Sequence, residues 1–257
     1  MSASHGRFVW YELMTTNTRA AEAYYSKVVG WRAQAAPNAS MPYTLFSVGE
    51  TPVSGMMDQP EEAKKMGAPP SWLGYVAVDD VDATTDQAKR LGAAIYVEPR
   101  DIPNVGRFAV IADPQKAAIG LFKWSIPMQE APVEPGTPGR IGWHELMTTD
   151  WEKAYAFYNA LFGWQKAEAF DMGAMGKYQI FSTGGPAVGG MFNKPPEVPH
   201  TFWLYYFNVG DFDAAVERVK ADGGAVVNGP MEVPGGSWIV QAKDPQGAMF
   251  ALVGRRG

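Results

Sequence analysis

The sequence predicts an α+β protein built as two tandem halves, each containing two βαβββ modules. Two observations predict this architecture: the chain repeats itself at about half its length, and each copy alternates short β-rich segments with amphipathic helical ones. The length of 257 residues also favours two domains over one. A hydrophobic content of 46% with 19% charged residues is a globular composition.

The repeat is clearest at the start of each copy. Gly6–Asn17 reads GRFVWYELMTTN and returns as Gly139–Asp150, GRIGWHELMTTD, at an offset of 139 − 6 = 133. The tripeptide beginning at Asp113 returns at Asp244, where the offset is 244 − 113 = 131. A drift of two residues requires only small loop insertions and deletions. The chain is therefore two diverged copies of one unit.

A proline-rich stretch separates the copies. Prolines stand at 127, 132, 135 and 138, which favours extended backbone and excludes a helix. We therefore expect a first domain over residues 6–124, a linker over 125–138 and a second domain over 139–254.

Each copy opens with a strand that leads into a capped helix. Residues 8–14 are β-rich, and Thr15-Thr16-Asn17 supplies turn and N-cap side chains for a helix over residues 18–29. Gly30 is suited to end that helix in the left-handed conformation. Short strands then follow at residues 32–35, 44–48 and 53–57. The next quarter repeats the order, with a strand at 73–78, a helix at 81–91 and strands at 94–98, 107–112 and 118–122.

Charge and composition exclude several classes of partner. The net charge of −5 disfavours nucleic acid as a partner. The absence of cysteine excludes disulfides and thiolate ligands and fits a reducing compartment. No signal peptide or membrane-spanning run is recognisable. We expect a cytoplasmic monomer or homodimer without a membrane partner.

These modules resemble the vicinal-oxygen-chelate superfamily, which includes glyoxalases, bleomycin-resistance proteins and dioxygenases. The resemblance rests on a helix in which alanine precedes Phe/Tyr-Tyr, here Ala156-Phe157-Tyr158, and which ends in Leu161-Phe162-Gly163. It also rests on Asp244-Pro245-Gln246-Gly247 before the last strand. The resemblance covers nearly all of the sequence outside the linker. It implies that each domain is a pair of βαβββ modules forming a curved mixed sheet around a cleft.

The resemblance also implies where a divalent metal would be held, by histidines from the first and fifth strands and a glutamate from the eighth. Carried over by the motif anchors, these ligand positions hold no histidine or carboxylate in either copy: Trp10, Leu73 and Gly120, then Trp143, Leu204 and Ala251. The histidines at 5, 144 and 200 do not rebuild the site, because His144 should face the helix and the others lie outside strands. We expect no metal and no cofactor, which disfavours a metal-dependent lyase or dioxygenase.

Strand alternation predicts which side chains line each cleft instead. Residues on the ligand face share the side of Trp10 or Trp143. They are Glu12, Met14, Leu73, Tyr75 and Gly120 in the first copy, and Glu145, Met147, Leu204, Tyr206 and Ala251 in the second. Such an aromatic, apolar lining with one carboxylate is typical of a small-molecule pocket. Alternatively, the indoles of Trp10 and Trp143 fill the hollow, and Trp31 and Trp164 belong to the core.

Glu12 and Glu145 are the candidate catalytic residues, because a carboxylate sheltered by aromatic rings suits acid–base chemistry. The alternative is a structural or ligand-orienting role, with Arg107 as a partner in the first copy only. We therefore expect a protein that binds a small, partly aromatic molecule without a metal. A metal-independent isomerase, lyase or hydroxylase-like enzyme that uses one glutamate as base is the alternative, and an interaction or storage role is a third.

Overall fold

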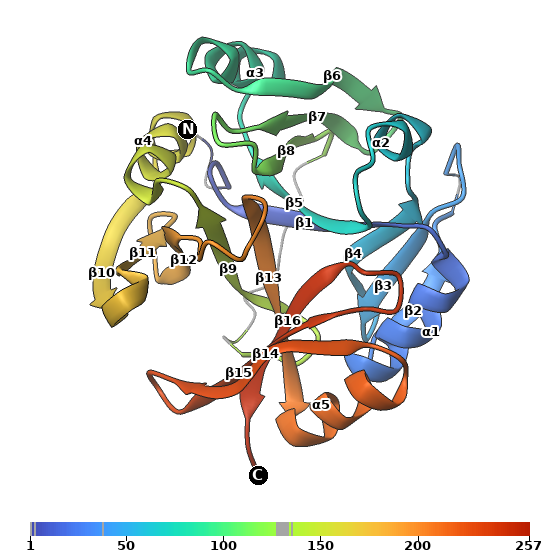
Figure 1. The fold of residues 1–257 in the computed structure, drawn as a ribbon. Coiled ribbons are helices and arrows are strands. Elements are labelled where there is room, and N and C mark those ends of the chain that lie inside the picture. The colour runs from blue at the N-terminus through green and yellow to red at the C-terminus, as the bar shows by residue number, and fades with distance from the viewer. Residues whose placement is uncertain (1, 3, 38, 127–133, 135) are drawn as a thin grey trace. The chain divides into compact units, whose positions relative to one another are not determined.

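The computed structural model describes residues 2, 4–37, 39–126, 134 and 136–257 (Figure 1). Along these residues the predicted βαβββ order occurs four times. Most of the predicted linker, residues 127–133 and 135, lies outside the described residues. The fold class predicted from the sequence is confirmed: two tandem repeats, each with an eight-stranded mixed sheet.

The first repeat forms one sheet with the strand order β2-β3-β4-β1-β5-β8-β7-β6. Strands β1 and β4 run parallel, as do β5 and β8, whereas the outer hairpins are antiparallel. A short helix that the sequence did not predict, α2, precedes β5. The elements are β1 (Phe8–Thr15), α1 (Thr18–Val28), β2 (Arg32–Ala35), β3 (Thr44–Val48), β4 (Thr51–Asp58), α2 (Glu61–Lys65), β5 (Ser71–Ala77), α3 (Val81–Arg90), β6 (Ala94–Ile102), β7 (Gly106–Ala112) and β8 (Ala118–Trp124).

The second repeat has the same topology, with the strand order β10-β11-β12-β9-β13-β16-β15-β14. Here β9 is parallel to β12 and β13 is parallel to β16. The elements are β9 (Ile141–Thr148), α4 (Trp151–Phe162), β10 (Gln165–Asp171), the 3-10 turn η1 (Gly173–Met175), β11 (Lys177–Ser182), β12 (Ala187–Asn193), β13 (Phe202–Asp211), α5 (Phe212–Ala221), β14 (Ala225–Val233), β15 (Ser237–Lys243) and β16 (Met249–Arg255).

Helix α1 shows how the local sequence sets these elements. The Oδ1 atom of Asn17 accepts a hydrogen bond from the backbone N–H of Ala20 at 3.1 Å, which satisfies one donor of the first turn. The buried residues of the helix lie at helical spacing and form one apolar face: Ala21, Tyr24, Tyr25 and Val28. Helix α4 is capped in the same way by Asp150, and it ends at Gly163 with a φ of 70°.

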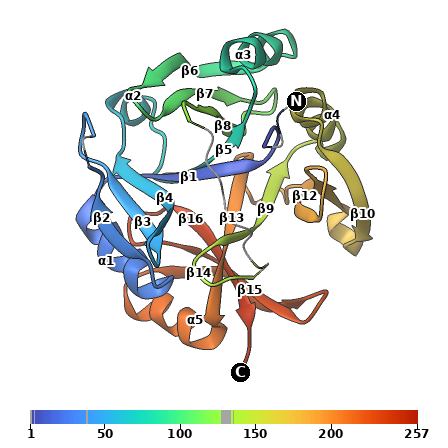
Figure 2. The same cartoon turned by 180° about the vertical axis from the view of Figure 1, so that it is seen from behind.

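The described residues form two compact units, and each unit draws on both repeats. Unit 1 lies within Met1–Val9, Gly74–Ala131 and Trp143–Trp203, and unit 2 within Trp10–Leu73, Pro132–Gly142 and Leu204–Gly257. In unit 2 the helices α1 and α5 lie side by side (Figures 1 and 2), and in unit 1 α3 contacts α4.

A buried chain of hydrogen bonds joins the two repeats inside unit 2. Trp72 Nε1 donates to Tyr25 Oη at 2.9 Å, and that hydroxyl donates to Asp244 Oδ2 at 3.0 Å. The other oxygen, Asp244 Oδ1, accepts the backbone N–H groups of Gln246 and Ala248. The Asp-Pro motif of one repeat is thereby bound by the helix tyrosine of the other.

Unit 1 contains the same chain with the repeats exchanged. Trp203 Nε1 donates to Tyr158 Oη at 3.1 Å, and this hydroxyl donates to Asp113 Oδ2 at 2.9 Å. The tryptophans that follow the first helix of each repeat are buried, as predicted, and each donates to the first glycine of the other repeat. Trp31 Nε1 bonds to Gly139 O at 2.7 Å, and Trp164 Nε1 bonds to Gly6 O at 2.6 Å.

Candidate functional site

The first strand presents two different faces. Tyr11 and Leu13 are buried, whereas Trp10, Glu12 and Met14 are half-buried. This alternation is the one predicted from the sequence, so Trp10 and Glu12 share a face of β1.

A third side chain joins Trp10 and Glu12 on that face. Tyr43, immediately before β3, accepts a hydrogen bond from Trp10 Nε1 at its Oη atom, over 3.0 Å. The same hydroxyl donates to Glu12 Oε2 over 2.9 Å. Burial, and then the nearby charge of Glu12, raise the pKa of Tyr43 well above its usual value. The tyrosine therefore keeps its proton at neutral pH and remains a donor to the carboxylate.

The second repeat contains the same arrangement in unit 1. Trp143 Nε1 donates to Tyr178 Oη at 2.8 Å, and Tyr178 Oη donates to Glu145 Oε2 at 3.1 Å. Burial and the charge of Glu145 likewise raise the pKa of Tyr178. We call these groups the first triad (Trp10, Tyr43, Glu12) and the second triad (Trp143, Tyr178, Glu145).

A glycine in the parallel strand makes room for each tyrosine. Gly55 is paired with Glu12 in register, and a Cβ atom at Gly55 would overlap the ring and hydroxyl of Tyr43. Gly190 is paired with Glu145, and a Cβ there would overlap Tyr178. These two glycines are therefore required by the close approach of a ring rather than by a turn.

The two triads differ in how far they are sheltered. Glu12 is half-buried, whereas Glu145 is only 7% exposed. One neighbouring position changes with this difference: Met57 of β4 corresponds to Phe192 of β12, whose ring centre lies 5.6 Å from that of Tyr178. A larger apolar side chain therefore stands beside the tyrosine of the second triad.

The predicted residues of the fifth and eighth strands also meet in pairs. Tyr75 is in register with Gly120 in unit 1, and a Cβ atom at Gly120 would overlap the Tyr75 ring. In unit 2 Tyr206 is in register with Ala251, and its Oη accepts a hydrogen bond from Gln241 Nε2 at 2.9 Å. Leu73 and Leu204 are buried. Because Tyr75 and Gly120 belong to unit 1 and the first triad to unit 2, the single cleft predicted from both stays a prediction.

Gly120→Ala should therefore be destabilising. The added methyl group has no space against the Tyr75 ring, so we expect a loss of about 2 kcal/mol in the free energy of unfolding, measured by urea denaturation. Gly185→Ala is the matched control, because nothing lies within 4 Å of a Cβ built there. Equal stability of the two variants would contradict the close packing of Tyr75 on Gly120.

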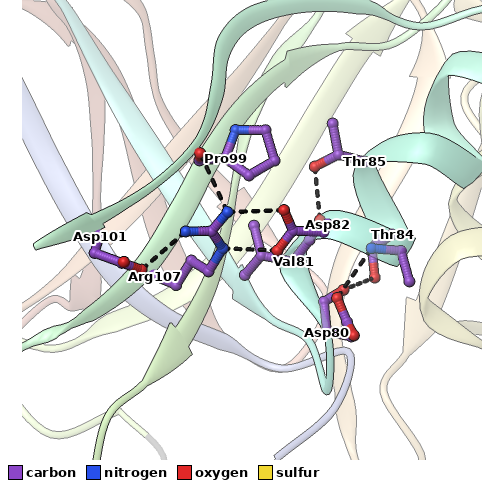
Figure 3. A network of polar contacts seen from close by, with 9 residues as sticks. Asp80, Val81, Asp82, Thr84, Thr85, Pro99, Asp101 and Arg107 are labelled. Atoms are coloured by element: carbon purple, nitrogen blue, oxygen red, sulfur yellow. Dashed lines mark hydrogen bonds and ion pairs between the residues drawn. The ribbon is translucent and has the colours of Figure 1, made fainter.

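Arg107 has other partners than Glu12, which corrects the expectation from the sequence (Figure 3). Its Nε and Nη2 atoms donate to the two carboxylate oxygens of Asp82, each at 2.7 Å, and Nη1 donates to Asp101 at 2.9 Å. The guanidinium lowers the pKa of Asp82. The pair ties the first turn of α3 to β7. In the second repeat Trp238 replaces Arg107, and Arg256 lies over its ring while pairing with Asp213.

The structure has two surface cavities of similar volume. One, of about 420 Å³, is lined by Asp101, Asn104, Arg107, Lys123 and Trp124, among others. The other, of about 460 Å³, includes Asn208, Ser237 and Arg255 in its lining. Neither lining contains a residue of either triad.

The family model of the Glyoxalase/Bleomycin resistance protein/Dioxygenase superfamily matches residues 7–121 and 140–252, which is most of the chain. The chain belongs to this superfamily. The resemblance stated from the motifs is confirmed.

Relatives of similar length exist within the superfamily. "Putative glyoxylase CFP32" of Mycobacterium tuberculosis is 32% identical over 247 residues, covering 95% of this chain and 93% of the relative. "Anthracycline biosynthesis protein DnrV" of Streptomyces peucetius is 32% identical over 266 residues, covering 96% and 93%. "Anthracycline biosynthesis protein DauV" of Streptomyces sp. (strain C5) is 31% identical over 261 residues, covering 96% and 93%.

Solved structures of superfamily members share the fold at low identity. The 2,3-dioxygenase LapB of Pseudomonas sp. KL28 has a TM-score of 0.66 at 12% identity, covering 98% of this chain and 92% of that chain. The Mn(II)-bound glyoxalase of Novosphingobium aromaticivorans has a TM-score of 0.63 at 15% identity, covering 99% and 83%. These similarities support the fold of the chain.

The side chains at the superfamily's expected metal positions do not fit a divalent ion. Indole and leucine side chains offer no lone pair for coordination, and Gly120 and Ala251 offer no side-chain donor. The ring of Tyr75 also occupies the space into which a side chain at position 120 would project. Among the described residues, no group of three or more His, Cys, Asp or Glu side chains is arranged to hold a metal.

His144 lies beside the second triad but on the other face of β9. It is 5% exposed and stacks on Phe8 with ring centres 3.9 Å apart. Its Nδ1 atom is 2.6 Å from Val188 O. Burial lowers the pKa of His144 to about 4, so the ring is neutral at physiological pH. Its burial on the face opposite Trp143 agrees with the alternation predicted for this strand.

Sequence reasoning missed Tyr43 and Tyr178. A usable signal was present, because Tyr43-Thr44-Leu45-Phe46 aligns with Tyr178-Gln179-Ile180-Phe181 in the repeat.

Within the described part of the chain, no helix is long and apolar enough to span a bilayer.

Proposed function

We propose that this superfamily member binds a small, partly aromatic organic molecule at the first triad without a metal ion. One observation carries the proposal. Where the family has its first metal ligand, this chain has Trp10, whose indole is hydrogen-bonded through Tyr43 to the carboxylate of Glu12. Aromatic surface with one oriented polar group is the usual chemistry of a small-molecule site. We expect this activity in the cytoplasm and in a monomer or homodimer.

The names of two relatives support an aromatic ligand. DnrV and DauV are named as anthracycline biosynthesis proteins, and anthracyclines are fused-ring aromatic compounds. The identities of 32% and 31% extend over nearly the whole of each chain. A fused aromatic ring is a suitable partner for the indole of Trp10, because offset stacking of two rings adds to the burial of their apolar area.

The first triad is the better candidate of the two. A ligand must reach the carboxylate and the indole, and Glu12, Trp10 and Met14 are all half-buried. In the second triad Glu145 and its neighbour Met147 are buried. We therefore assign binding to the first repeat and a structural role to the second triad.

The proposal is tested by titrating the protein with fused-ring probes, for example 1-naphthylmethylamine and 1,4-dihydroxyanthraquinone, by isothermal calorimetry. We expect binding at one site per chain, and a loss of about tenfold to a hundredfold in affinity for Trp10→Ala, which corresponds to the removal of a buried ring contact. Absence of binding by every probe, or a loss caused by Trp143→Ala instead, would contradict the assignment. Circular dichroism confirms that each variant is folded.

A metal-independent enzyme is the second candidate function. The observation that favours it is the hydrogen bond from Tyr43, which fixes the direction of the Glu12 carboxylate as a general base requires. Each probe that binds is therefore incubated with the protein and analysed by mass spectrometry for conversion. A rate that disappears in Glu12→Gln while affinity is kept supports the enzyme, whereas binding without conversion supports the binding protein.

A further inference from the structure

The cavity of about 460 Å³ lies within unit 2, where three strands of the second repeat meet (Figure 1). Strand β13 is parallel to β16, and β16 is antiparallel to β15, so the ends of β13 and β16 lie beside the start of β15. Each strand contributes one polar residue to the lining. They are Asn208 from β13, Ser237 from β15 and Arg255 from β16. Such convergent polar groups in a hollow of this size are typical of a small-molecule site.

Asn208 supplies a sheltered amide at this cavity. The residue is 7% exposed, and its carboxamide makes no hydrogen bond within the described residues. A Cβ atom at Gly142 would lie 2.5 Å from Asn208 Oδ1 and 2.8 Å from Nδ2, so the glycine makes room for the carboxamide. Gly142 is itself exposed, which places the carboxamide near the surface. A largely buried amide without a protein partner needs solvent or a ligand to satisfy it.

The end of β13 is also irregular at this point. Three steps along β13, from Asn208 to Asp211, oppose two steps along β16. The residues between them, Val209 and Gly210, line the cavity. A bulge of this kind interrupts the regular pairing and turns a strand end away from its ladder. The interruption therefore opens the sheet where the three polar residues converge.

The charge of this lining is positive. Arg255 is exposed, and none of the described lining residues is an aspartate or a glutamate. Asp211, which is in register with Arg255, caps α5: its Oδ1 accepts the backbone N–H of Ala214 at 3.0 Å. The neighbouring Arg256 pairs with Asp213, whereas Arg255 forms no ion pair in the part of the chain that the structure describes. The guanidinium of Arg255 can therefore meet an anion.

The first repeat holds none of these three side chains at the corresponding positions. Its residues there are Ala77, Gly106 and Trp124. The cavity in unit 1 includes Lys123, but Asp101 also stands in its lining. Its Arg107 is already bound by Asp82 and Asp101. An anion in that cavity would meet a carboxylate and an occupied guanidinium, so the two repeats differ in what they can bind.

We propose that the cavity in unit 2 is a further ligand site, which binds a small organic monocarboxylate through Arg255, Asn208 and Ser237. A planar guanidinium donates two parallel hydrogen bonds to a carboxylate, and the carboxamide N–H and the hydroxyl are further donors. One positive charge matches a monoanion, whereas a dianion would bring excess negative charge to a protein of net charge −5. An apolar wall suits the hydrocarbon body of the ligand. It is formed by Pro138, Val209 and Val253.

The experiment compares benzoate with benzamide, its neutral isostere, and with benzylamine, which is a cation at pH 7. The full-length, isotope-labelled protein is titrated with each probe and followed by NMR. Benzoate should bind at least about tenfold more tightly than benzamide, and benzylamine most weakly. The preference should shrink at high salt, because Arg255 is exposed and its charge is screened. The largest shifts should fall on Gly210, Ser237 and Gly254, which line the cavity.

Several outcomes would overturn the inference. They are equal affinities for benzoate and benzamide, no binding of benzoate up to about 10 mM, and shifts centred on Lys123 of the other cavity. Tighter binding of inorganic phosphate than of benzoate would also overturn it, because the site would then belong to another class of anion. The site shares no residue with either triad, so these outcomes leave the function proposed above untouched.

Variants then locate the carboxylate. Arg255→Gln should bring the affinity for benzoate down to that for benzamide, and Asn208→Ala should weaken benzoate binding about threefold to tenfold. Arg256→Gln is the matched control, because Arg256 lies over Trp238 and pairs with Asp213 outside the lining. Its affinity for benzoate should stay within about twofold of the native value. A preference for benzoate that persists in Arg255→Gln, or that is lost in Arg256→Gln instead, would contradict the assignment to Arg255.

Discussion

Replacing Tyr25 by phenylalanine is expected to lower the free energy of unfolding by about 3 kcal/mol. The change removes one hydroxyl and leaves two buried partners, Trp72 Nε1 and Asp244 Oδ2, without their hydrogen bonds to it. Each buried polar group that loses its partner costs about 1–3 kcal/mol, and a charged one more. Burial already raises the pKa of Asp244, whereas the bond from Tyr25 opposes that shift. Urea denaturation measures the loss.

Two further variants control this result. Tyr96→Phe removes a hydroxyl from a ring that is 50% exposed, so its stability should stay within about 0.5 kcal/mol of the native value. Tyr158→Phe breaks the equivalent chain in unit 1, through Trp203 and Asp113, and should cost about as much as Tyr25→Phe. A Tyr25→Phe protein as stable as Tyr96→Phe would show that the buried chain contributes nothing.

Acidification should destabilise the fold through His144. The pKa is about 4 in the folded protein against 6.5 for the free side chain, because burial disfavours the imidazolium ion. Above pH 6.5 the ring is neutral in both states, and its contribution to stability is fully present. As the pH falls from 6.5 to about 4, the unfolded chain takes up a proton that the folded chain does not, so about 3 kcal/mol is lost progressively.

The comparison variant is His144→Gln, which stays neutral throughout and keeps a donor for Val188 O. Stability is measured at several pH values between 7 and 4, and the difference between native and variant isolates His144. Burial raises the pKa values of Asp113 and Asp244, so their contribution to stability increases as the pH falls. Both proteins contain these two groups, so their contribution cancels in the difference. Parallel pH curves for the two proteins would contradict a buried neutral His144.

Most of the fold was predictable because its determinants are local or repeated. The N-cap at Asn17 and the apolar spacing through Tyr25 define α1, and the repeat transfers the same reasoning to α4. Alternation along β1 correctly placed Trp10 and Glu12 on one face. The burial of Trp31 and Trp164 followed from their place directly after a helix that packs on the sheet.

The candidate site was predictable only in part, because it depends on contacts between distant strands. Tyr43 reaches Glu12 across 31 positions in the sequence, from a segment whose loop residues show no periodicity. Arg107 pairs with Asp82 on α3, which no pattern along β7 indicates. The binding of Asp244 by Tyr25 spans 219 positions and joins the two repeats. Such pairings depend on tertiary packing, which spacing within one element does not encode.

A crystal structure of the protein soaked with 1-naphthylmethylamine tests the central claim most directly. We predict one bound molecule per chain, with its ring against Trp10 of the first triad, and none at the second triad. A ligand bound away from Trp10, equal occupation at both triads, or a metal ion coordinated in either repeat would contradict the account.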